Sequence, residues 1–293
     1  MSSIANTRAP GRRLAAAETL RSALAILVLV VFSLIVLVPL LFMFGSSFMP
    51  ASEVMNMPYR WIPQQWKWQN YVQALAGNDG NWIYLRNILN SLVVSLTIAT
   101  TTVLISASVG YGLAKFRFKG RNAVFMAIMA TMMIPFETVM VPLYLIVVKL
   151  GMQDTYWGLI IPFLTNAFGV FLMRQYLITF PSEMLDAARI DGCSEVRIFT
   201  SIVLKNSGPA AATLAILSFR QQWDNLLWPL LVAQREEMKT IPAYIVKFAA
   251  EKNADEGAMM AVAAIASIPV FVLFFTLSKY FLGGSAVYSA GKE

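Results

Sequence analysis

The sequence predicts an all-α, polytopic membrane protein with six transmembrane helices. Of its 293 residues, 58% are hydrophobic and only 13% are charged, whereas a soluble domain usually carries about 25% charged residues. The mean hydropathy is +0.62. Several apolar runs reach about 20 residues, which is the length that crosses a ~30 Å hydrocarbon core. Composition and run length therefore lead to the same fold class.

Six segments are predicted to cross the membrane. The third is predicted to break or re-enter near its outer end, because Pro135, Glu137 and Pro142 interrupt it. Such irregular backbone is tolerated in a membrane only where protein or a water-filled cavity covers it. The predicted spans are 22–44, 88–107, 123–144, 157–177, 208–231 and 259–281.

The distribution of lysine and arginine predicts the orientation of these spans. With the N-terminus inside, 14 of the 23 basic residues lie on the inner side, eight lie outside and one, Arg220, falls within a span. Inner loops carry the excess of positive charge, so both termini are expected in the cytoplasm. The expected organisation is a basic tail at 1–21, a transmembrane domain at 22–284 and a short tail at 285–293.

Several classes of chemistry are excluded by composition. The chain has no histidine, and Cys193 is its only cysteine. An intrachain disulfide, a histidine-based metal site and a histidine proton relay are therefore not expected. The phosphate-binding pattern G-x-x-x-x-G-K-[ST] is also missing from the sequence. No catalytic, cofactor or metal site is predicted in this chain.

Charged residues inside predicted spans are costly and therefore informative. Besides Glu137, the fifth span holds Arg220 and Asp224, which are four residues apart on one helix and able to pair. One interpretation is a structural ion pair buried in the helix bundle. The other is that they line a transport path, where Trp223 and Asn225 would offer a sugar or polyol an aromatic face and hydrogen-bonding groups.

The outer segment 45–87 is rich in aromatic residues. Amphipathic rings lie favourably at the level of the lipid headgroups, so an interfacial anchor is the favoured interpretation. A platform on which sugars stack is the alternative. The rings concerned belong to Trp61, Trp66, Trp68, Tyr71 and Trp82.

The connection between the fourth and fifth spans, 181–205, carries the most distinctive pattern. Ser182 is predicted to cap a helix whose first turn holds Glu183 and Asp186, acidic residues that suit the helix dipole. Ala187 and Ala188 are expected to expose a small, smooth surface onto which another protein could pack closely.

A bend and a second helix are predicted to follow. Gly192 is a weak helix former that permits the bend. The apolar residues available for burial in the second, amphipathic helix are Val196, Ile198, Phe199, Ile202 and Val203. From the residues alone, the connection is either an amphipathic segment resting on the membrane or a docking surface for another protein.

The same connection resembles a known sequence motif. It reads Asp186-Ala187-Ala188, three residues, Gly192, nine residues, Ile202, one residue and Leu204. This is similar to the EAA loop of binding-protein-dependent ABC importer permeases. The segment 111–120 resembles the basic turn that follows the second span in that family. The segments 133–144, 171–176 and 223–230 resemble its carbohydrate-uptake branch, and the chain as a whole resembles the smaller permease of maltose-type systems. The resemblance covers essentially residues 24–284.

Three positions depart from the family pattern. Asp186 stands where glutamate is usual, which keeps the charge and shortens the side chain by one methylene. Cys193 stands in place of alanine, and Lys205 in place of proline.

The resemblance implies a type I ABC importer permease fold and a transport subunit that is not itself an enzyme. A homologous second permease, two ATPase subunits that bind ATP and magnesium, and an extracytoplasmic solute-binding protein are the implied partners, in the cell inner membrane. Alternating access would carry a sugar or related polyol into the cytoplasm. The implied ATPase-docking residues are Glu183, Met184, Asp186, Ala187, Ala188, Arg189, Asp191 and Gly192. Those proposed for the translocation path are Arg220, Trp223, Asp224 and Asn225.

Two alternatives stay open at this stage. The first is an ABC importer permease for another solute, such as phosphate, an amino acid or a peptide. The second is an ion-coupled secondary carrier, which would need its own coupling acids inside the membrane. Only Glu137 and Asp224 are candidates for that role.

Overall fold

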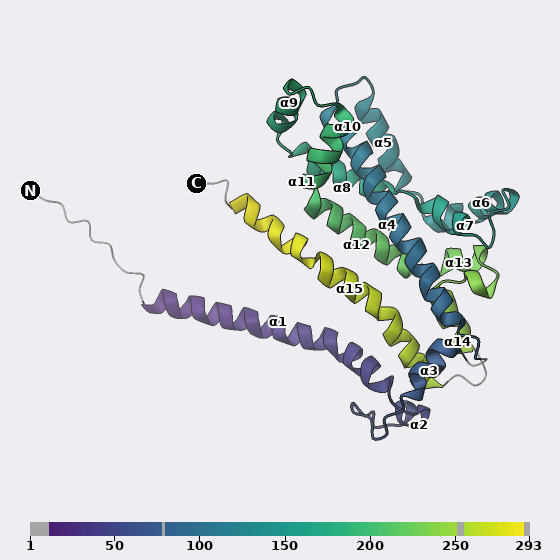
Figure 1. Ribbon diagram of the computed structural model, residues 1–293. Coiled ribbons are helices and arrows are strands. Elements are labelled where there is room, and N and C mark those ends of the chain that lie inside the picture. Colours follow the sequence, from purple (N-terminus) through teal and green to yellow (C-terminus); the bar gives the residue numbers. More distant parts are fainter. Residues whose placement is uncertain (1–11, 78–79, 251–254, 290–293) are drawn as a thin grey trace, which may run out of the picture.

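The computed structural model describes residues 12–77, 80–250 and 255–289, and within these ranges it is helical and contains no strand (Figure 1). Side chains are described for residues 19–77, 80–250 and 255–278. The all-α prediction is confirmed for this part of the chain. α1 begins at Arg12, within the predicted tail 1–21, and α15 runs to Ser289, within the predicted tail 285–293. The remainder of both tails, 1–11 and 290–293, lies outside the described residues.

Among the described residues, three unbroken helices are long and apolar enough to cross a membrane. They are α1 (Arg12–Ser46), α4 (Ile83–Lys115) and α15 (Glu256–Ser289). Each contains one of the predicted spans. Three further pairs of helices in the described residues bend at a short break, and counting each pair as one span gives up to six spans by length and composition.

The third predicted span is a helix pair bent by 92°. α5 (Arg121–Thr131) ends first, and α6 (Phe136–Lys149) begins after Pro135, which occupies its N-cap position with extended backbone. The residue before a proline is disfavoured in the helical conformation, so the chain leaves α5 and turns here. The predicted break is confirmed, whereas Pro142 lies inside α6 without ending it.

The fourth span is also broken, which the sequence analysis did not predict. α7 (Tyr156–Ile160) continues into the 3₁₀ turn η1 (Ile161–Phe163), and α8 (Ala167–Ile178) restarts at an angle of 45°. The side-chain oxygen of Asn166 accepts a 2.7 Å hydrogen bond from the backbone N–H of Gly169 and so caps α8.

The predicted fifth span, 208–231, is too long. α12 (Gly208–Trp223) ends at Trp223, and a separate short helix, α13 (Leu227–Val232), follows. Asp and Asn offer the backbone local hydrogen bonds that compete with helix continuation. Here the side-chain oxygen of Asn225 accepts from the backbone N–H of Trp228 at 3.4 Å, which starts α13 in a new direction.

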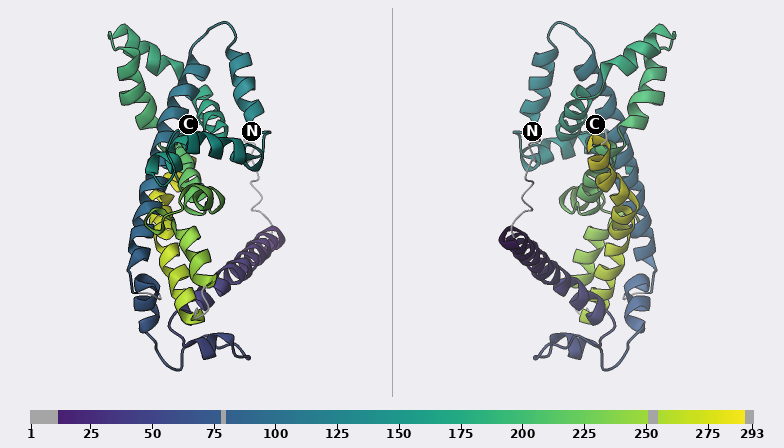
Figure 2. Two further views of the ribbon diagram at one scale, coloured as in Figure 1. Left: turned by 90° about the vertical axis from the view of Figure 1, so that its right-hand side faces the viewer. Right: turned by 90° about the vertical axis from the view of Figure 1, so that its left-hand side faces the viewer.

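α4 is the central helix and packs against α8 and α12 (Figures 1 and 2). Gly110 allows the closest approach. A Cβ atom at this position would lie 2.9 Å from the backbone nitrogen of Arg174 and 3.0 Å from the Cβ of Met173. Small residues of this kind let membrane helices pack backbone against backbone.

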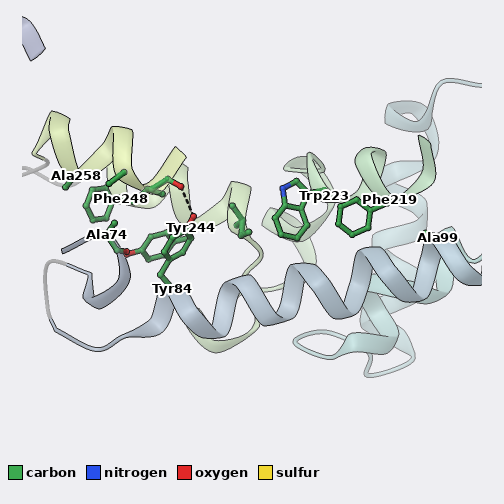
Figure 3. Close-up of a cluster of buried hydrophobic side chains, with 11 residues drawn as sticks. Ala74, Tyr84, Ala99, Phe219, Trp223, Tyr244, Phe248 and Ala258 are labelled. Carbon is green, nitrogen blue, oxygen red and sulfur yellow. Dashed lines mark hydrogen bonds between the residues drawn. The ribbon is translucent and has the colours of Figure 1, made fainter. Parts of the chain in front are cut away.

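A second cluster joins the opposite end of α4 to α14 (Ile241–Ala250) and α15. The rings of Tyr84 and Tyr244 stack with centroids 4.5 Å apart (Figure 3). The buried Tyr84 hydroxyl donates a 2.9 Å hydrogen bond to the carbonyl of Val262. Both polar and apolar parts of this tyrosine are therefore satisfied inside the protein.

α1 leaves the bundle along most of its length (Figure 1). In the most apolar 18-residue stretch of the described part of α1, no residue is buried within the chain. The main packing partner of α1 is α15. An apolar surface of this size indicates contact with lipid or with another subunit.

The aromatic outer segment packs on itself between α1 and α4, around α2 (Ala51–Met55) and α3 (Gln69–Ala76). The ring of Phe48 lies 5.3 Å from that of Trp66 and 4.7 Å from that of Trp68. More than half of each tryptophan is exposed. The role of these rings as an interfacial anchor stays a prediction.

Candidate functional site

The docking loop, residues 181–205, has the predicted helix–bend–helix shape. α9 (Ser182–Ile190) is followed by a turn and then by α10 (Glu195–Ile198), the π-helical turn η2 (Phe199–Val203) and α11 (Leu204–Asn206). The short helices from α10 to α11 lead into α12 through a bend of 78°. The loop and the bundle meet at one end of the molecule (Figure 1).

The bend is a helix-ending motif that depends on Gly192. Its φ is +79°, in the left-handed region that favours glycine. The backbone N–H of Gly192 donates to the backbone carbonyl of Arg189 at 3.0 Å. The backbone N–H of Cys193 donates to the backbone carbonyl of Ala188 at 3.0 Å. These two bonds form the Schellman arrangement that closes a helix with a left-handed residue. Nothing lies within 4 Å of a Cβ added to Gly192, so the constraint comes from the backbone alone.

The predicted capping role of Ser182 is wrong. Pro181 is the N-cap of α9, and no side chain caps this end. Ser182 is instead the first helical residue, and its hydroxyl accepts a 3.3 Å hydrogen bond from the ammonium of Lys115. The same ammonium donates to the carbonyl of Phe180 at 2.5 Å. The basic end of α4 therefore holds the start of the loop.

A network of hydrogen bonds ties the two halves of the loop together and to α4. The guanidinium of Arg189 donates from Nε to Glu195 at 2.7 Å and from Nη1 to Asp186 at 2.7 Å. The other oxygen of Glu195 accepts from the buried hydroxyl of Tyr111 at 2.8 Å. Hydrogen bonding to Glu195, partly offset by desolvation, raises the pKa of Arg189 above its ordinary value. Asp186, one of the implied ATPase-docking residues, is already paired with Arg189 within the chain.

Most of the predicted docking residues lie on the surface of this chain. Ala188 is the exception: it is only 8% exposed and packs with Leu185 against Tyr111, Ile198 and Val203. The expected smooth surface is therefore provided by Ala187, while Ala188 holds α9 to the bundle. The exposed members of the predicted set are Glu183, Met184, Asp186, Ala187, Arg189, Asp191 and Gly192.

Two apolar residues of the loop are more exposed than expected. Ile190 is 87% exposed, and Val196, which was predicted to be buried, is 74% exposed. Ile198 and Val203 are fully buried, so Val196, two residues before Ile198, points away from the bundle. The sequence carried one signal that was missed: Ile190 directly precedes the Asp191–Gly192 turn, where no neighbouring turn of helix can cover it.

The residues predicted for the translocation path do not form one surface. Arg220 and Asp224 pair at 3.3 Å, but their side chains are 69% and 58% exposed, so the pair is not buried within the chain. Trp223 is 3% exposed and donates from its indole to the carbonyl of Ala266 at 3.0 Å. The amide of Asn225 donates to Gln222 at 3.1 Å. Any role of these residues in transport stays a prediction.

Another face of α12 borders a cavity of about 700 Å³ between α4, α5 and α8. It contributes Leu217, Ser218 and Gln221 to the cavity wall. Sequence reasoning missed this site, because none of its residues is charged and its walls come from segments far apart in the chain.

Comparisons with known proteins agree with this geometry. The family model described as "Binding-protein-dependent transport system inner membrane component" matches residues 103–283. The arabinooligosaccharides transport system permease protein AraQ of Bacillus subtilis is 34% identical over 87% of this chain and 90% of its own length. The sn-glycerol-3-phosphate transport system permease protein UgpE of Brucella abortus is 32% identical over 88% and 93%.

A solved structure shares the fold. It is titled as a bacterial ABC transporter involved in the import of the acidic polysaccharide alginate, and the matched chain is 23% identical with a TM-score of 0.79. The match covers 94% of this chain and 100% of that one. The type I ABC importer permease fold expected from the sequence is thereby confirmed. The chain is a membrane protein that belongs to the family of binding-protein-dependent transport system inner membrane components.

Proposed function

We propose that this chain is one of two permease subunits of an ATP-driven importer that carries a sugar or related polyol into the cytoplasm. ATP and magnesium would be bound by two partner ATPase subunits, and a solute-binding protein would deliver the solute from outside. The relatives named for transport of arabinooligosaccharides and of sn-glycerol-3-phosphate both support a polyhydroxylated solute.

The observation that carries the proposal is the surface of the docking loop. Met184, Ile190 and Val196 are large apolar side chains that are 45%, 87% and 74% exposed on a loop otherwise rich in charge. Exposed apolar groups rimmed by polar residues are typical of a protein interface. The small side chain of Ala187 would let a partner approach the backbone of α9 between them.

The hydrogen-bond network gives the loop a way to transmit force. Arg189 joins α9 to Glu195 of α10, and Glu195 is joined in turn to Tyr111 of α4. A movement of the ATPase subunits against α9 would therefore reach a central membrane helix directly. Alternating access would follow as a shift between two arrangements of the bundle, biased by ATP binding.

The test is uptake by the complete complex in proteoliposomes. The chain, its partner permease, the two ATPase subunits and the binding protein are reconstituted with ATP inside the vesicles. Uptake should require ATP hydrolysis and should stop when the ATPase subunits are left out. Uptake that continues without ATP would contradict the proposal and favour the ion-coupled carrier.

The proposed orientation, with both termini and the docking loop in the cytoplasm, has a separate test. Cys193 is the only cysteine, so a Cys193→Ala background lets a single new thiol be placed at the exposed position 183. A membrane-impermeant maleimide should label Glu183→Cys in inside-out vesicles but not in right-side-out ones. A Trp66→Cys variant in the outer segment is the matched control, and it should give the opposite pattern.

A further inference from the structure

A cavity of about 700 Å³ lies where four helices meet, and its size falls within the range of small-molecule sites. The residues that line it belong to α4, α5, the start of α8 and α12, and to the breaks after α5 and before α8. None of the residues predicted for the translocation path, Arg220, Trp223, Asp224 and Asn225, borders it. The lining includes the polar side chains of Thr131, Thr165, Asn166, Ser218 and Gln221.

Every helix that forms the cavity contributes a lining residue at a similar depth. On α4, Ile105 is ten residues from Lys115, and on α12, Ser218 is ten residues from Gly208. Thr131 is likewise ten residues from the start of α5, and Ala167 is eleven residues from the end of α8. At a rise of about 1.5 Å per residue, each distance is about 15 Å from the end that carries the docking loop. That is about half of a ~30 Å hydrocarbon core.

Two of the broken spans open onto this cavity. The break between α5 and α6 contributes Met132 and Ile134, and the break before α8 contributes Thr165 and Asn166. Non-helical backbone at membrane depth is tolerated only where it is buried in protein or lines a polar cavity. Broken helices near the midplane are also where transporters commonly place their solute sites.

The wall carries hydrogen-bonding groups that are not used within the chain. The Ser218 hydroxyl is buried without a partner among the described residues. Gln221 is exposed and likewise makes no side-chain hydrogen bond within the described part of the chain. Asn166 uses its oxygen to cap α8, and its amide group stays available. A buried polar group without a partner is unfavourable by about 1–3 kcal/mol, so the hydroxyl of Ser218 favours a ligand that bonds to it. Gln221 and the amide group of Asn166 offer the same ligand further hydrogen bonds.

None of the fourteen residues that line the cavity is charged. The nearby arginines are engaged elsewhere: the guanidinium of Arg174 lies 4.0 Å from the ring centroid of Phe125, and Arg220 pairs with Asp224. A phosphate or carboxylate at this depth would lack a cation to compensate it, which is unfavourable in a low-dielectric site. Hydroxyl groups would find both donors and acceptors.

We infer that this cavity is this chain's share of the solute path and that it takes a neutral, hydroxyl-rich solute. The inference rests on the proposed importer function, and it separates this chain from relatives and neighbours named for anionic solutes. The partner permease would close the open side of the cavity.

The first experiment tests the site itself in the reconstituted complex. Ser218→Ala and Gln221→Leu should each lower the rate of solute uptake about threefold to tenfold, the range expected for losing one hydrogen bond. Complex assembly and ATPase activity stimulated by the binding protein should stay near wild type. Ser108→Ala is the control, because this exposed hydroxyl bonds only to its own helix at Leu104.

Failure of the site and failure of the importer function give different results. If the two cavity variants take up solute at the wild-type rate while uptake still requires ATP, the cavity assignment is overturned and the importer function stands. If wild-type uptake itself is independent of ATP, the importer function fails instead. Loss of both uptake and assembly in the cavity variants, but not in Ser108→Ala, would show a purely structural role and would also overturn the assignment.

The second experiment tests whether the transported solute is uncharged. The wild-type complex is offered labelled arabino-oligosaccharides, maltose and glycerol as neutral probes, and sn-glycerol-3-phosphate and alginate oligosaccharides as anionic ones. At least one neutral probe should be taken up at least tenfold faster than either anion. Faster uptake of an anion, or no uptake of any neutral probe, would overturn the inference.

Discussion

The hydroxyl of Tyr111 donates a 2.8 Å hydrogen bond to the carboxylate of Glu195, which joins the end of α4 to the second half of the docking loop. Tyr111 is 5% exposed, so the bond is shielded from water on one side. Glu195 is held on its other oxygen by Arg189. The docking loop is therefore attached to the membrane bundle by a charged and directional contact as well as by apolar packing.

Removing this contact should loosen the coupling between ATP hydrolysis and transport. Tyr111→Phe keeps the ring and deletes only the hydroxyl, and a hydrogen bond to a charged group contributes about 1.5–3 kcal/mol. We expect the number of solute molecules moved per ATP to fall several-fold while the complex still assembles. Glu195→Gln should have the same direction of effect.

The control for this prediction is Tyr59→Phe in the outer segment, where the side chain is 54% exposed. It should leave the ratio of transport to ATP hydrolysis unchanged. A normal ratio in both Tyr111→Phe and Glu195→Gln would show that the bond carries no part of the coupling.

The turn at Gly192 makes a graded prediction. Asn tolerates the left-handed conformation, so Gly192→Asn should keep most of the ATPase activity that the binding protein stimulates. Gly192→Val should lose most of it, because a β-branched residue at a φ of +79° is strained. Gly192→Pro should abolish it, because proline fixes φ near −65°.

The measurement is the ATPase activity of the purified complex, stimulated by the binding protein and compared at equal protein concentration. The predicted order of activity is Asn, then Val, then Pro. Within the described part of the chain nothing lies within 4 Å of a Cβ at this position, so a steric clash inside the chain does not set the order. Equal activity in the Asn, Val and Pro variants would mean that the left-handed turn is dispensable.

The sequence was sufficient for the broad fold and for the outline of the docking loop. Apolar runs and basic turns depend on local composition, and the break at Pro135 depends on the chemistry of a single residue. The break before α8 and the end of α12 at Trp223 were not anticipated. At the first position the side chain of Asn166 caps α8, and at the second the side-chain oxygen of Asn225 accepts from the backbone N–H of Trp228 in the turn before α13. Local side-chain hydrogen bonds of this kind compete with helix continuation and are not visible in the apolar pattern.

The candidate sites were harder to predict because burial depends on contacts distant in sequence. Ala187 and Ala188 look equivalent in the sequence, yet only Ala188 meets Tyr111 and Leu177 in the folded chain. Trp223 was placed on a transport path because of its charged neighbour, but its ring packs against α15. The side chains of successive residues in a helix point in directions about 100° apart. Tertiary packing decides which of these directions faces the core.

The segment that joins α13 to α14, residues 233–240, lies on the predicted outer side and is called the outer connection below; it offers a test of stability. Asn87 and Asn90 are fully buried on α4, and their amides donate to the carbonyls of Glu236, Glu237 and Lys239 at 2.7–2.9 Å. Asn90→Ala would leave two carbonyls and the hydroxyl of Tyr156 without this partner. We expect it to lower the free energy of unfolding by about 2–4 kcal/mol, since each buried group left unpaired is unfavourable by about 1–3 kcal/mol.

Thermal unfolding of the purified complex would measure this effect. Asn122→Ala, an exposed asparagine beside the basic turn, is the matched control and should change the Tm little. An unchanged Tm in Asn90→Ala would mean that the outer connection is held by other contacts.

The same connection predicts a pH dependence through Glu236. Its carboxylate accepts from Lys239 at 2.6 Å and from Lys247 at 3.0 Å. Desolvation by burial opposes ionisation, but the two lysines outweigh it and lower the pKa of Glu236 below its ordinary value. A carboxyl whose pKa is lower in the folded state stabilises the fold fully above its unfolded pKa of about 4.3. That stabilisation is lost as the pH falls through the lower, folded value.

The Tm of the wild-type complex should therefore exceed that of Glu236→Gln by a constant amount between about pH 7 and pH 5. The difference in Tm should shrink towards zero as the pH is lowered below about 4. The protonated side chain of Glu236 is then uncharged, as the amide of the variant is at every pH. Glu183→Gln, an exposed substitution at the other end of the molecule, should show no such convergence. A Tm difference that grows as the pH falls would contradict the prediction. It would mean that Glu236 stabilises the fold in its protonated form.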